Sequence, residues 1–260
     1  MNRFFFLISL FLATVGRAAS AEWQVVKNKT LGTLPAAAVM KSIALSQASH
    51  DGVPEEVQLT VVIFSEKNYR LAVIDVPKRD QSLQQVMSGN EFVAGINGGY
   101  FHPDNKPLGL LMHDGKVIHA QERARLLSGF LVSNGHELEL LRVAEKMPSG
   151  PLDVLQAGPF LVDRGESVVG LEATKVAWRS FLASDGHGDF AMGVISPVTL
   201  AGASTILLAA APDIFSSGSL QRALNLDGGS STAFWAALQP APFLLHGYVQ
   251  VRNFLGLQLR

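Results

Sequence analysis

The sequence predicts an α+β fold, a single domain of mixed, mostly antiparallel β-sheet with packed helices. Three observations lead to this prediction. Runs rich in β-branched and alternating apolar residues recur along the chain. Glycine-containing turns separate most of these runs, and only two segments have a helical pattern. No internal repeat, low-complexity tract or linker is visible, so one domain is expected over residues 22–260.

The first 21 residues have the layout of a secretory signal peptide. Residues 1–3 form a cationic start, residues 4–15 are almost wholly apolar, and residues 19–21 form a small-residue cleavage site. The apolar stretch is shorter than the ~20 residues that a membrane-spanning helix needs. We therefore expect cleavage after Ala21, no stable membrane insertion of the mature protein, and a periplasmic or secreted location.

Composition narrows the class of protein further. The chain has no cysteine, so a hydrophobic core rather than a disulfide framework must hold it, and its 48% hydrophobic content is ample for that. Without Arg3 and Arg17 the mature chain carries 19 basic and 22 acidic residues, a net charge of about −3. No basic cluster is visible, so nucleic acid is not an expected partner. No cofactor is indicated, and the oligomeric state stays open.

Strands joined by turns dominate the predicted order of elements. Residues 57–64 and 69–76 are expected to form a hairpin across the polar link SEKN, and residues 91–96 form the next strand. Glycine turns, among them Asn-Gly and Asp-Gly pairs that supply positive φ, predict further strand pairs. These pairs span residues 108–119, 128–143, 160–169 and 179–195. A last strand is expected within residues 248–259.

Two helices are predicted. The first spans residues 80–89, with Asp80 as its N-cap and Gly89 as its stop. The second begins with Ser196 as its cap and Pro197 in its first turn, and it ends at Pro212. Its apolar face consists of Leu200, Ala203, Leu207 and Ala211.

Two stretches place an amide side chain beside glycine after an apolar run. Asn97 is followed by Gly98 and Gly99, so this amide and the following N–H groups are candidates for the mouth of a pocket. A glycine turn closed by aromatic residues is the structural alternative. Further along, Gln156 precedes Gly158 and a proline, a pattern that also fits a sheet edge or bulge.

The run ALNLDGGSST at 223–232 is the most unusual stretch, because an apolar strand stops at one carboxylate. Leu224 and Leu226 are expected on the buried face of a strand, which leaves Asn225 and Asp227 on the other face. A carboxylate there is costly unless it binds something. Helix capping by Asp227 is the alternative, but a cap needs only one polar residue. Two glycines, Gly228 and Gly229, follow and leave room for a ligand, and the hydroxyl residues Ser230, Ser231 and Thr232 come next.

Two arginines interrupt apolar strands. Arg179 opens one strand, and Arg252, followed by Asn253, lies near the start of the last. An arginine in such a place commonly binds a carboxylate or phosphate through its forked donors. A surface position on an edge strand is an equally good interpretation for each.

Taken together these stretches resemble the phosphodiester glycosidase domain family. The matching segments, in the family's order from about Leu59 to the C-terminus, are NGGYF at 97–101, LGLLMHDGKV at 108–117, QAGPFLV at 156–162, Arg179-Ser180, ALNLDGGSST at 223–232 and VRNFL at 251–255. The resemblance implies hydrolysis of a sugar-1-phosphate diester, or a related glycosidic bond, in an envelope or extracellular glycan. Ser180 replaces the family's usual threonine. This difference resembles sequences of a bacterial branch of the family, and it leaves the identity of the sugar and of the leaving group undetermined.

The resemblance also implies a set of site residues. Its expected catalytic residues are Asp227, Arg179 and Asn97, and its expected substrate-binding residues are Gly98, Gly99, Gln156, Gly158, Asn225, Gly228, Gly229 and Arg252. The hydroxyls and the amide beside these positions add Ser230, Ser231 and Asn253 as expected substrate-binding residues. Asp227 is the expected carboxylate for an oxocarbenium-like transition state. The two arginines, with backbone N–H groups, would neutralise the phosphate. The candidates for a second carboxylate are Glu172, Asp185 and Asp189.

Other functions remain open. A non-catalytic glycan- or envelope-binding module would use the same cleft without needing the acid. A serine hydrolase that uses Ser230 or Ser231 has less support, because no GxSxG elbow is present. The seven histidines form no metal-binding motif, so no metal is predicted, although a divalent cation at Asp227 is an alternative.

Overall fold

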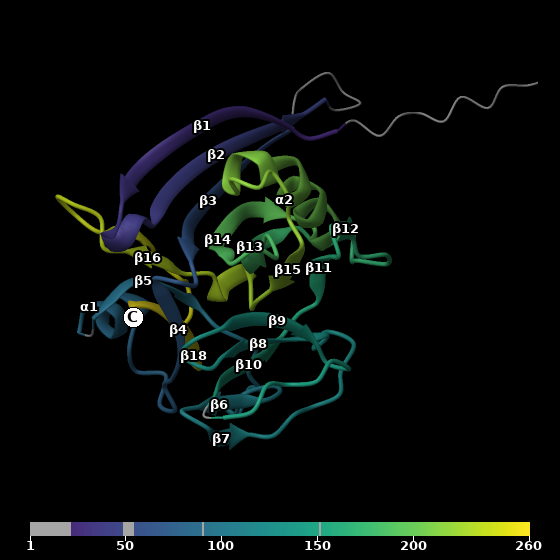
Figure 1. Ribbon diagram of the computed structural model, residues 1–260. Coiled ribbons are helices and arrows are strands. Elements are labelled where there is room, and N and C mark those ends of the chain that lie inside the picture. Colours follow the sequence, from purple (N-terminus) through teal and green to yellow (C-terminus); the bar gives the residue numbers. More distant parts are fainter. Residues whose placement is uncertain (1–21, 49–54, 90, 151) are drawn as a thin grey trace, which may run out of the picture.

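An eight-stranded antiparallel sheet is the largest element of the computed structural model, which describes residues 22–48, 55–89, 91–150 and 152–260. In spatial order its strands are β1 (Gln24–Thr33), β2 (Val39–Gln47), β3 (Glu55–Ser65), β14 (Asp189–Val198), β13 (Ala177–Ser184), β15 (Arg222–Asn225), β11 (Phe160–Asp163) and β12 (Glu166–Ser167). The first three strands are long and curved, and helix α2 (Leu200–Ile214) lies within their curve (Figure 1).

Two five-stranded sheets complete the β-structure. One has the order β7 (Lys116–His119), β6 (Leu111–His113), β10 (Asp153–Ala157), β8 (Gly129–Ser133) and β9 (Leu138–Arg142). The other has the order β17 (Phe243–Leu245), β16 (Phe234–Ala236), β5 (Phe92–Asn97), β18 (Asn253–Leu259) and β4 (Tyr69–Asp75). All strand pairs among the described residues are antiparallel, so the expected mixed character of the sheets is wrong.

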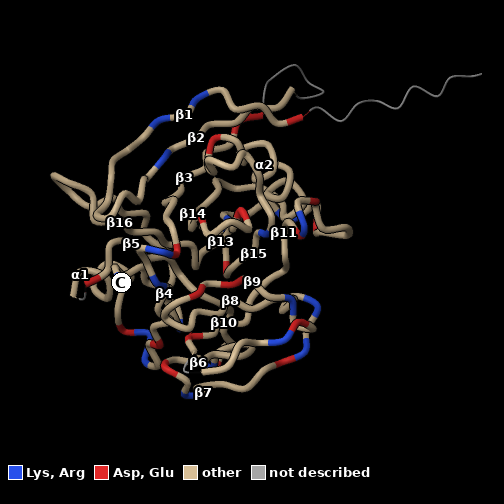
Figure 2. Tube along the Cα trace, in the orientation of Figure 1, with Lys and Arg blue, Asp and Glu red and all other residues tan. Residues whose placement is uncertain are grey.

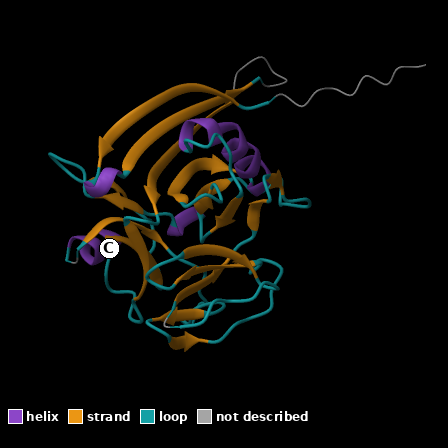
Figure 3. Cartoon of the chain, in the orientation of Figure 1, coloured by secondary structure: helices purple, strands orange, loops and turns teal. Residues whose placement is uncertain are grey.

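Helices are a minor part of the fold (Figure 3). Besides α2 the described chain has α1 (Leu83–Ser88) and two single 3-10 turns, η1 (Pro35–Ala37) and η2 (Gly229–Ser231). The two α-helices do pack on the sheets, α2 against the eight-stranded sheet and α1 against β5 and β16. The fold is therefore more strongly β than the α+β prediction implied.

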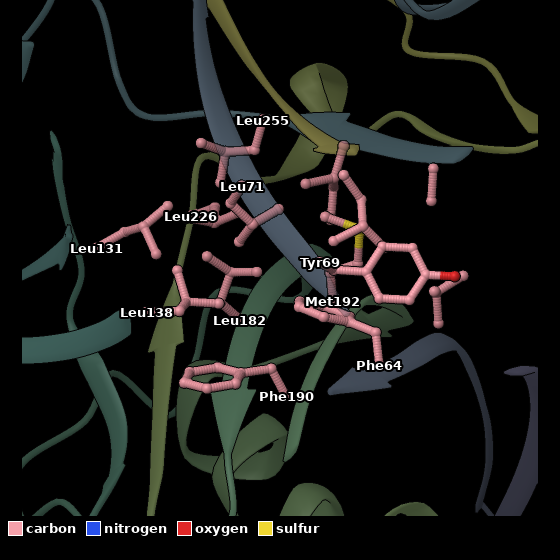
Figure 4. Close-up of a cluster of buried hydrophobic side chains, with 14 of the residues drawn as sticks. Phe64, Tyr69, Leu71, Leu131, Leu138, Leu182, Phe190, Met192, Leu226 and Leu255 are labelled. Carbon is pink, nitrogen blue, oxygen red and sulfur yellow. The ribbon is translucent and has the colours of Figure 1, made fainter. Parts of the chain in front are cut away.

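The central strands β13 and β14 of the eight-stranded sheet are buried on both faces. On one face Phe181 and Ala183 of β13 pack in the core beneath α2, together with Ile206 of the helix. Leu182, which points the opposite way, belongs to a second core that fills the space between the three sheets. Figure 4 shows this second core, in which Leu71 and Leu255 of one five-stranded sheet belong to the same cluster as Leu182.

The predicted hairpin of residues 57–64 and 69–76 is wrong. Both strands exist, but β3 pairs with β2 and β14, whereas β4 pairs with β18. The short link therefore carries the chain from one sheet to another. Strands β1 and β2 were not predicted. β1 is largely exposed and polar, and Lys41 of β2 donates to the carbonyl of Asp213 in α2, so neither strand has a clear apolar alternation.

The helix boundaries also differ from the prediction. Ser82 rather than Asp80 caps α1, through a capping box with Gln85, while the stop at Gly89 is confirmed. Thr199 caps α2 through the N–H of Gly202. The predicted cap Ser196 belongs instead to the end of β14, and α2 continues through Pro212 to Ile214.

The four predicted strand pairs with glycine turns are confirmed as the hairpins β6–β7, β8–β9, β11–β12 and β13–β14. The last strand begins at Asn253, later than expected. The predicted signal peptide lies outside the described residues, and within them no helix has the length and apolar character to cross a bilayer. Acidic and basic residues are interspersed over the chain (Figure 2).

Candidate functional site

Strands from all three sheets end or begin at one place near the centre of the molecule (Figure 1). Backbone hydrogen bonds join them there. The N–H of Asp227 donates to the carbonyl of Gly98 at 3.1 Å, and the N–H of Leu226 donates to the carbonyl of Ser180 at 2.8 Å. The N–H of Asn225 reaches the carbonyl of Pro159 at 3.0 Å. Segments far apart in sequence therefore meet around Asp227.

Asn97 lies at the end of β5 and is fully buried. Its side-chain oxygen accepts hydrogen bonds from the Ser180 hydroxyl at 2.7 Å and from the Ala233 N–H at 3.1 Å. Its side-chain nitrogen donates to the carbonyl of Asp227 at 2.7 Å. Because protein groups occupy both ends of the amide, Asn97 positions the segment that carries Asp227 rather than lining a pocket.

Asp227 directly follows the last residue of the buried run 223–226 and is itself partly exposed. Burial raises the pKa of its carboxyl to about 6, although a hydrogen bond from Ser231, the N–H of Gly228 and the charge of Lys175 act in the opposite direction. The Gly228 N–H lies 2.9 Å from the carboxylate. A carboxyl that titrates near pH 6 can exchange a proton under physiological conditions, as an acid or base catalyst must.

Tyr100 is a site residue that the sequence analysis missed. Its hydroxyl lies 2.7 Å from the carbonyl of Gly158 and 3.1 Å from that of Leu226, and it accepts a hydrogen bond from the Asn225 side chain at 2.8 Å. Burial, and then the nearby charge of Asp227, raise the pKa of Tyr100, so the phenol stays protonated. Its position directly after the glycine pair Gly98 and Gly99 is the feature of the sequence that could have indicated its place in the site.

The side-chain nitrogen of Asn225 is fully hydrogen-bonded, whereas its side-chain oxygen has no donor among the described residues. Its side-chain nitrogen donates to Tyr100 and to the carbonyls of Gly158 and Leu226. Its side-chain oxygen is buried and, among the described residues, has no hydrogen-bond donor. A buried acceptor without a partner in the protein is a place where a ligand hydroxyl or water can donate.

Arg179 lies close to these groups but is largely occupied. It is 7% exposed, and its guanidinium donates to the carbonyls of Val198 and Lys175. Burial lowers its pKa, while the groups of Tyr100 and Glu172 act in the opposite direction, so all three lie within electrostatic range. Arginine nevertheless remains charged.

Arg252 is not part of this cluster. Its guanidinium forms a two-pronged ion pair with Asp75, with nitrogen–oxygen distances of 2.7 and 2.9 Å, and it also donates to the carbonyl of Asn105. Asn253, next to it, receives the N–H of Gly99 at 2.7 Å. Arg252 was predicted to bind the phosphate, but a carboxylate already neutralises its guanidinium.

Gln156 and the predicted second carboxylate Asp185 also lie elsewhere. The fully buried Gln156 amide accepts from the N–H groups of Leu110 and Glu122 and donates to the carbonyl of Glu122, which fixes the loop ahead of β8. Asp185 binds the N–H groups of the turn between β13 and β14, at the end of β13 opposite Arg179. Of the predicted carboxylates only Glu172 is near Arg179.

The glycines serve close backbone contacts more than ligand space. A side chain at Gly98 would come within 2.0 Å of the Asn253 amide oxygen, and one at Gly228 within 2.6 Å of the Trp178 carbonyl. The N–H groups of Gly98 and Gly99 are both taken by Asn253. Gly229 differs, because its φ is +63° and, apart from its two chain neighbours, no other described residue lies within 4 Å of the point that a side-chain carbon would occupy.

Ser230 and Ser231 flank the acid without forming a hydrolase triad. Ser230 is exposed, and the buried Ser231 hydroxyl interacts with Asp227. Within the described part of the chain no hydrogen bond joins either serine to a histidine, and no group of three or more potential ligand side chains can hold a metal ion. The site thus contains one acid, one tyrosine, two amides and nearby cations.

Known proteins resemble the chain in family and fold. The phosphodiester glycosidase family model matches residues 90–257. The catalytic domain of zebrafish N-acetylglucosamine-1-phosphodiester alpha-N-acetylglucosaminidase, auto-inhibited by its pro-peptide, superposes with a TM-score of 0.65 at 14% identity, over 90% of this chain and 88% of that one. A hypothetical protein from Synechocystis gives 0.54 at 16% identity, over 93% and 68%. No curated protein matches the chain in sequence.

Proposed function

Because the chain belongs to the phosphodiester glycosidase family, we propose that it hydrolyses the glycosidic bond of a sugar-1-phosphate diester or a closely related glycoside. One observation carries the proposal. Asp227 is a partly exposed carboxyl with a pKa raised to about 6, at the point where three sheets meet beside Tyr100 and Arg179. Groups with perturbed pKa values gather at functional sites.

The reaction needs one water molecule. The Asp227 carboxylate removes a proton from the water, whose oxygen forms a bond to the anomeric carbon of the sugar. The bond between that carbon and the phosphate oxygen breaks, and its electron pair leaves with the oxygen as a phosphate monoester. The proton on Asp227 then passes to solvent. Since a phosphate oxygen is a good leaving group, no strong general acid is required.

One feature gives the substrate orientation beside the acid. The unpartnered oxygen of Asn225 can accept a hydrogen bond from a sugar hydroxyl. The lining of an open cavity of about 580 Å³ includes Pro159 and Glu172, but not Asp227, Tyr100 or Asn225. The proposal therefore rests on the side chains around the acid and not on that cavity.

An exported location accompanies this proposal. Residues 1–21 have the composition of a signal peptide, and residues 22–260 form the mature domain. A Burkholderia pseudomallei protein whose description calls it exported has a similar fold, with a TM-score of 0.50 at 10% identity over 92% of this chain and 86% of that one. We expect the substrate in the cell envelope or outside the cell.

The test is hydrolysis of the methyl phosphodiester of α-N-acetylglucosamine 1-phosphate, and of related sugar-1-phosphodiesters, by the purified mature protein. We expect wild type to release the free sugar and Asp227→Asn to lose at least a hundredfold in kcat. Asp114→Asn, in the exposed turn between β6 and β7, is the matched control and should retain full activity. Equal turnover by wild type and Asp227→Asn would exclude the assigned role.

The rival function is a non-catalytic module that binds a glycan. It predicts calorimetric binding of the same sugar-1-phosphodiesters by wild type and no free sugar after prolonged incubation. This outcome would replace the hydrolase proposal.

A further inference from the structure

The site lacks an evident partner for the phosphate of its proposed substrate. Arg252 is paired with Asp75, and Arg179 is buried and donates to two backbone carbonyls. The N–H groups of Gly98 and Gly99 are bound by Asn253. An anionic substrate therefore needs another cation close to Asp227.

Lys175 occupies such a position. Its side chain is exposed, and within the described residues its ammonium has no hydrogen bond or ion pair. Backbone contacts bring its loop to the site: Gly228, next to Asp227, lies against the carbonyl of Trp178, and a side-chain carbon built on Gly228 would be 3.8 Å from the Cα of Arg179. The positive charge of Lys175 acts to lower the pKa of the Asp227 carboxyl, against the effect of burial.

The loop that carries Lys175 is held in place from two sides. One carboxylate oxygen of Glu172 accepts hydrogen bonds from the Thr174 hydroxyl, the Thr174 N–H and, at 2.7 Å, the Lys175 N–H. On the other side the Arg179 guanidinium donates to the Lys175 carbonyl. The backbone is thus fixed by a carboxylate and a guanidinium, while the ammonium stays free to reach a ligand.

We propose that Lys175 binds the phosphate of the substrate and gives the site its preference for sugar phosphodiesters over neutral glycosides, with Arg179 and Glu172 as positioning residues for its loop. The proposal rests on the hydrolase function above. An ammonium is a strong donor to phosphate oxygens, and its attraction acts on a charged leaving group but not on a neutral one.

The experiment compares two probes of the same sugar: the methyl phosphodiester of α-N-acetylglucosamine 1-phosphate and the neutral 4-nitrophenyl α-N-acetylglucosaminide. Lys175→Met should raise KM for the phosphodiester about tenfold and change KM for the neutral glycoside less than twofold. Lys175→Arg should restore most of the binding. Salt should weaken phosphodiester binding by wild type but not by Lys175→Met. Lys116→Met, an exposed lysine on β7, is the matched control.

Three results would overturn the proposal. The first is unchanged kinetics for Lys175→Met. The second is an equal loss on both probes, which would mean that the lysine acts only through Asp227. The third is failure of Lys175→Arg to restore phosphodiester binding while the variant is folded. If wild type cleaves neither probe, the hydrolase function fails separately. Calorimetric binding of the phosphodiester to wild type and Lys175→Met then still decides the role of the lysine.

Discussion

The side-chain nitrogen of Asn97 lies 2.7 Å from the backbone carbonyl oxygen of Asp227, 130 residues later in the chain. Through the same amide, the end of β5 is tied to Ser180 of β13 and to the N–H of Ala233. One buried side chain therefore links two sheets and the segment that carries the proposed catalytic acid.

Replacing Asn97 with alanine should destabilise the protein strongly. The change leaves the Asp227 carbonyl, the Ala233 N–H and the Ser180 hydroxyl without this partner, and each buried unpaired group costs about 1–3 kcal/mol. We expect a loss of about 3 kcal/mol in the free energy of unfolding by urea. Asn28→Ala, which removes an exposed amide on β1, should cost under about 1 kcal/mol. Similar losses for the two variants would contradict the linking role of Asn97.

The pKa of Asp227 predicts opposite trends in activity and stability. If the carboxylate is the base, kcat/KM should rise with pH through a single transition near pH 6 and then level off. The folded-state pKa lies above the usual value of 3.8, so the carboxyl contributes stability below pH 4 that is lost as pH rises through 6.

The Asp227→Asn variant should therefore be more stable than wild type at pH 7.5, by about 2 kcal/mol, and lose most of that advantage at pH 4. Urea unfolding at the two pH values measures the difference. A variant less stable than wild type at pH 7.5 would mean that the ionised carboxylate has a favourable partner, such as a bound cation.

The Tyr100→Phe variant tests whether the Tyr100 hydroxyl positions the residues around Asp227. The change removes a hydroxyl that contacts the carbonyls of Gly158 and Leu226 and receives the Asn225 amide. Because Asn225 and the segment before Asp227 lose a common partner, we expect kcat/KM to fall about tenfold. We expect the free energy of unfolding to fall by about 1 kcal/mol. Full activity in the phenylalanine variant, measured with the phosphodiester, would remove Tyr100 from the site.

Arg252→Ala separates a structural arginine from a substrate-binding one. The variant leaves the carboxylate of Asp75, whose side chain is 15% exposed, without its guanidinium, and we expect a loss of about 2–3 kcal/mol of stability. KM for the phosphodiester should stay within twofold of wild type at temperatures where both proteins are folded. A large rise in KM with stability intact would restore the phosphate-binding role implied by the sequence.

A second ion-pair network joins β15 and β11 to the loop after β9. Arg222 contacts Glu145 at 2.7 Å and Asp163 at 3.1 Å, and Arg142 contacts Asp163 at 2.9 Å. The hydrogen bonds from the Arg222 guanidinium lower the pKa of Glu145 to about 2, so its contribution is present above pH 4.5 and is lost as pH falls through 2.

Glu145→Gln should therefore cost about 1 kcal/mol at pH 7, a modest value because the Glu145 side chain is 36% exposed, and almost nothing near pH 2. Chemical unfolding at both pH values measures this. Glu137→Gln, in the exposed turn between β8 and β9, is the comparison and should change stability less at pH 7. A cost for Glu145→Gln that does not depend on pH would mean that packing rather than charge is responsible.

Local chemistry made the hairpins predictable, whereas long-range pairing did not follow from the sequence. The Asp-Gly turn between β6 and β7 needs positive φ at Asp114 and Gly115, which the residue types themselves indicate. The separation of β3 from β4 depends on partners far along the chain, and no feature of the polar link between them encodes it.

The same division applies to the site. Glycines and amides around the acid stand out in the sequence because such residues are unusual between apolar strands. The pairing of Arg252 with Asp75, 177 residues away, has no local signal. Lys175 has none either, because an isolated lysine in a polar loop is ordinary until Arg179 and Glu172 are seen to hold that loop.

The meeting of three sheets around Asp227 has a consequence for the order of events during folding. The two amides lie at the ends of β5 and β15, which belong to different sheets, and the tyrosine and the acid follow those strands, so no single sheet assembles the site on its own. Catalytic competence should consequently emerge only with the final docking step. An enzymatic assay would then report the completion of folding, and nascent or partly folded chains would be inert.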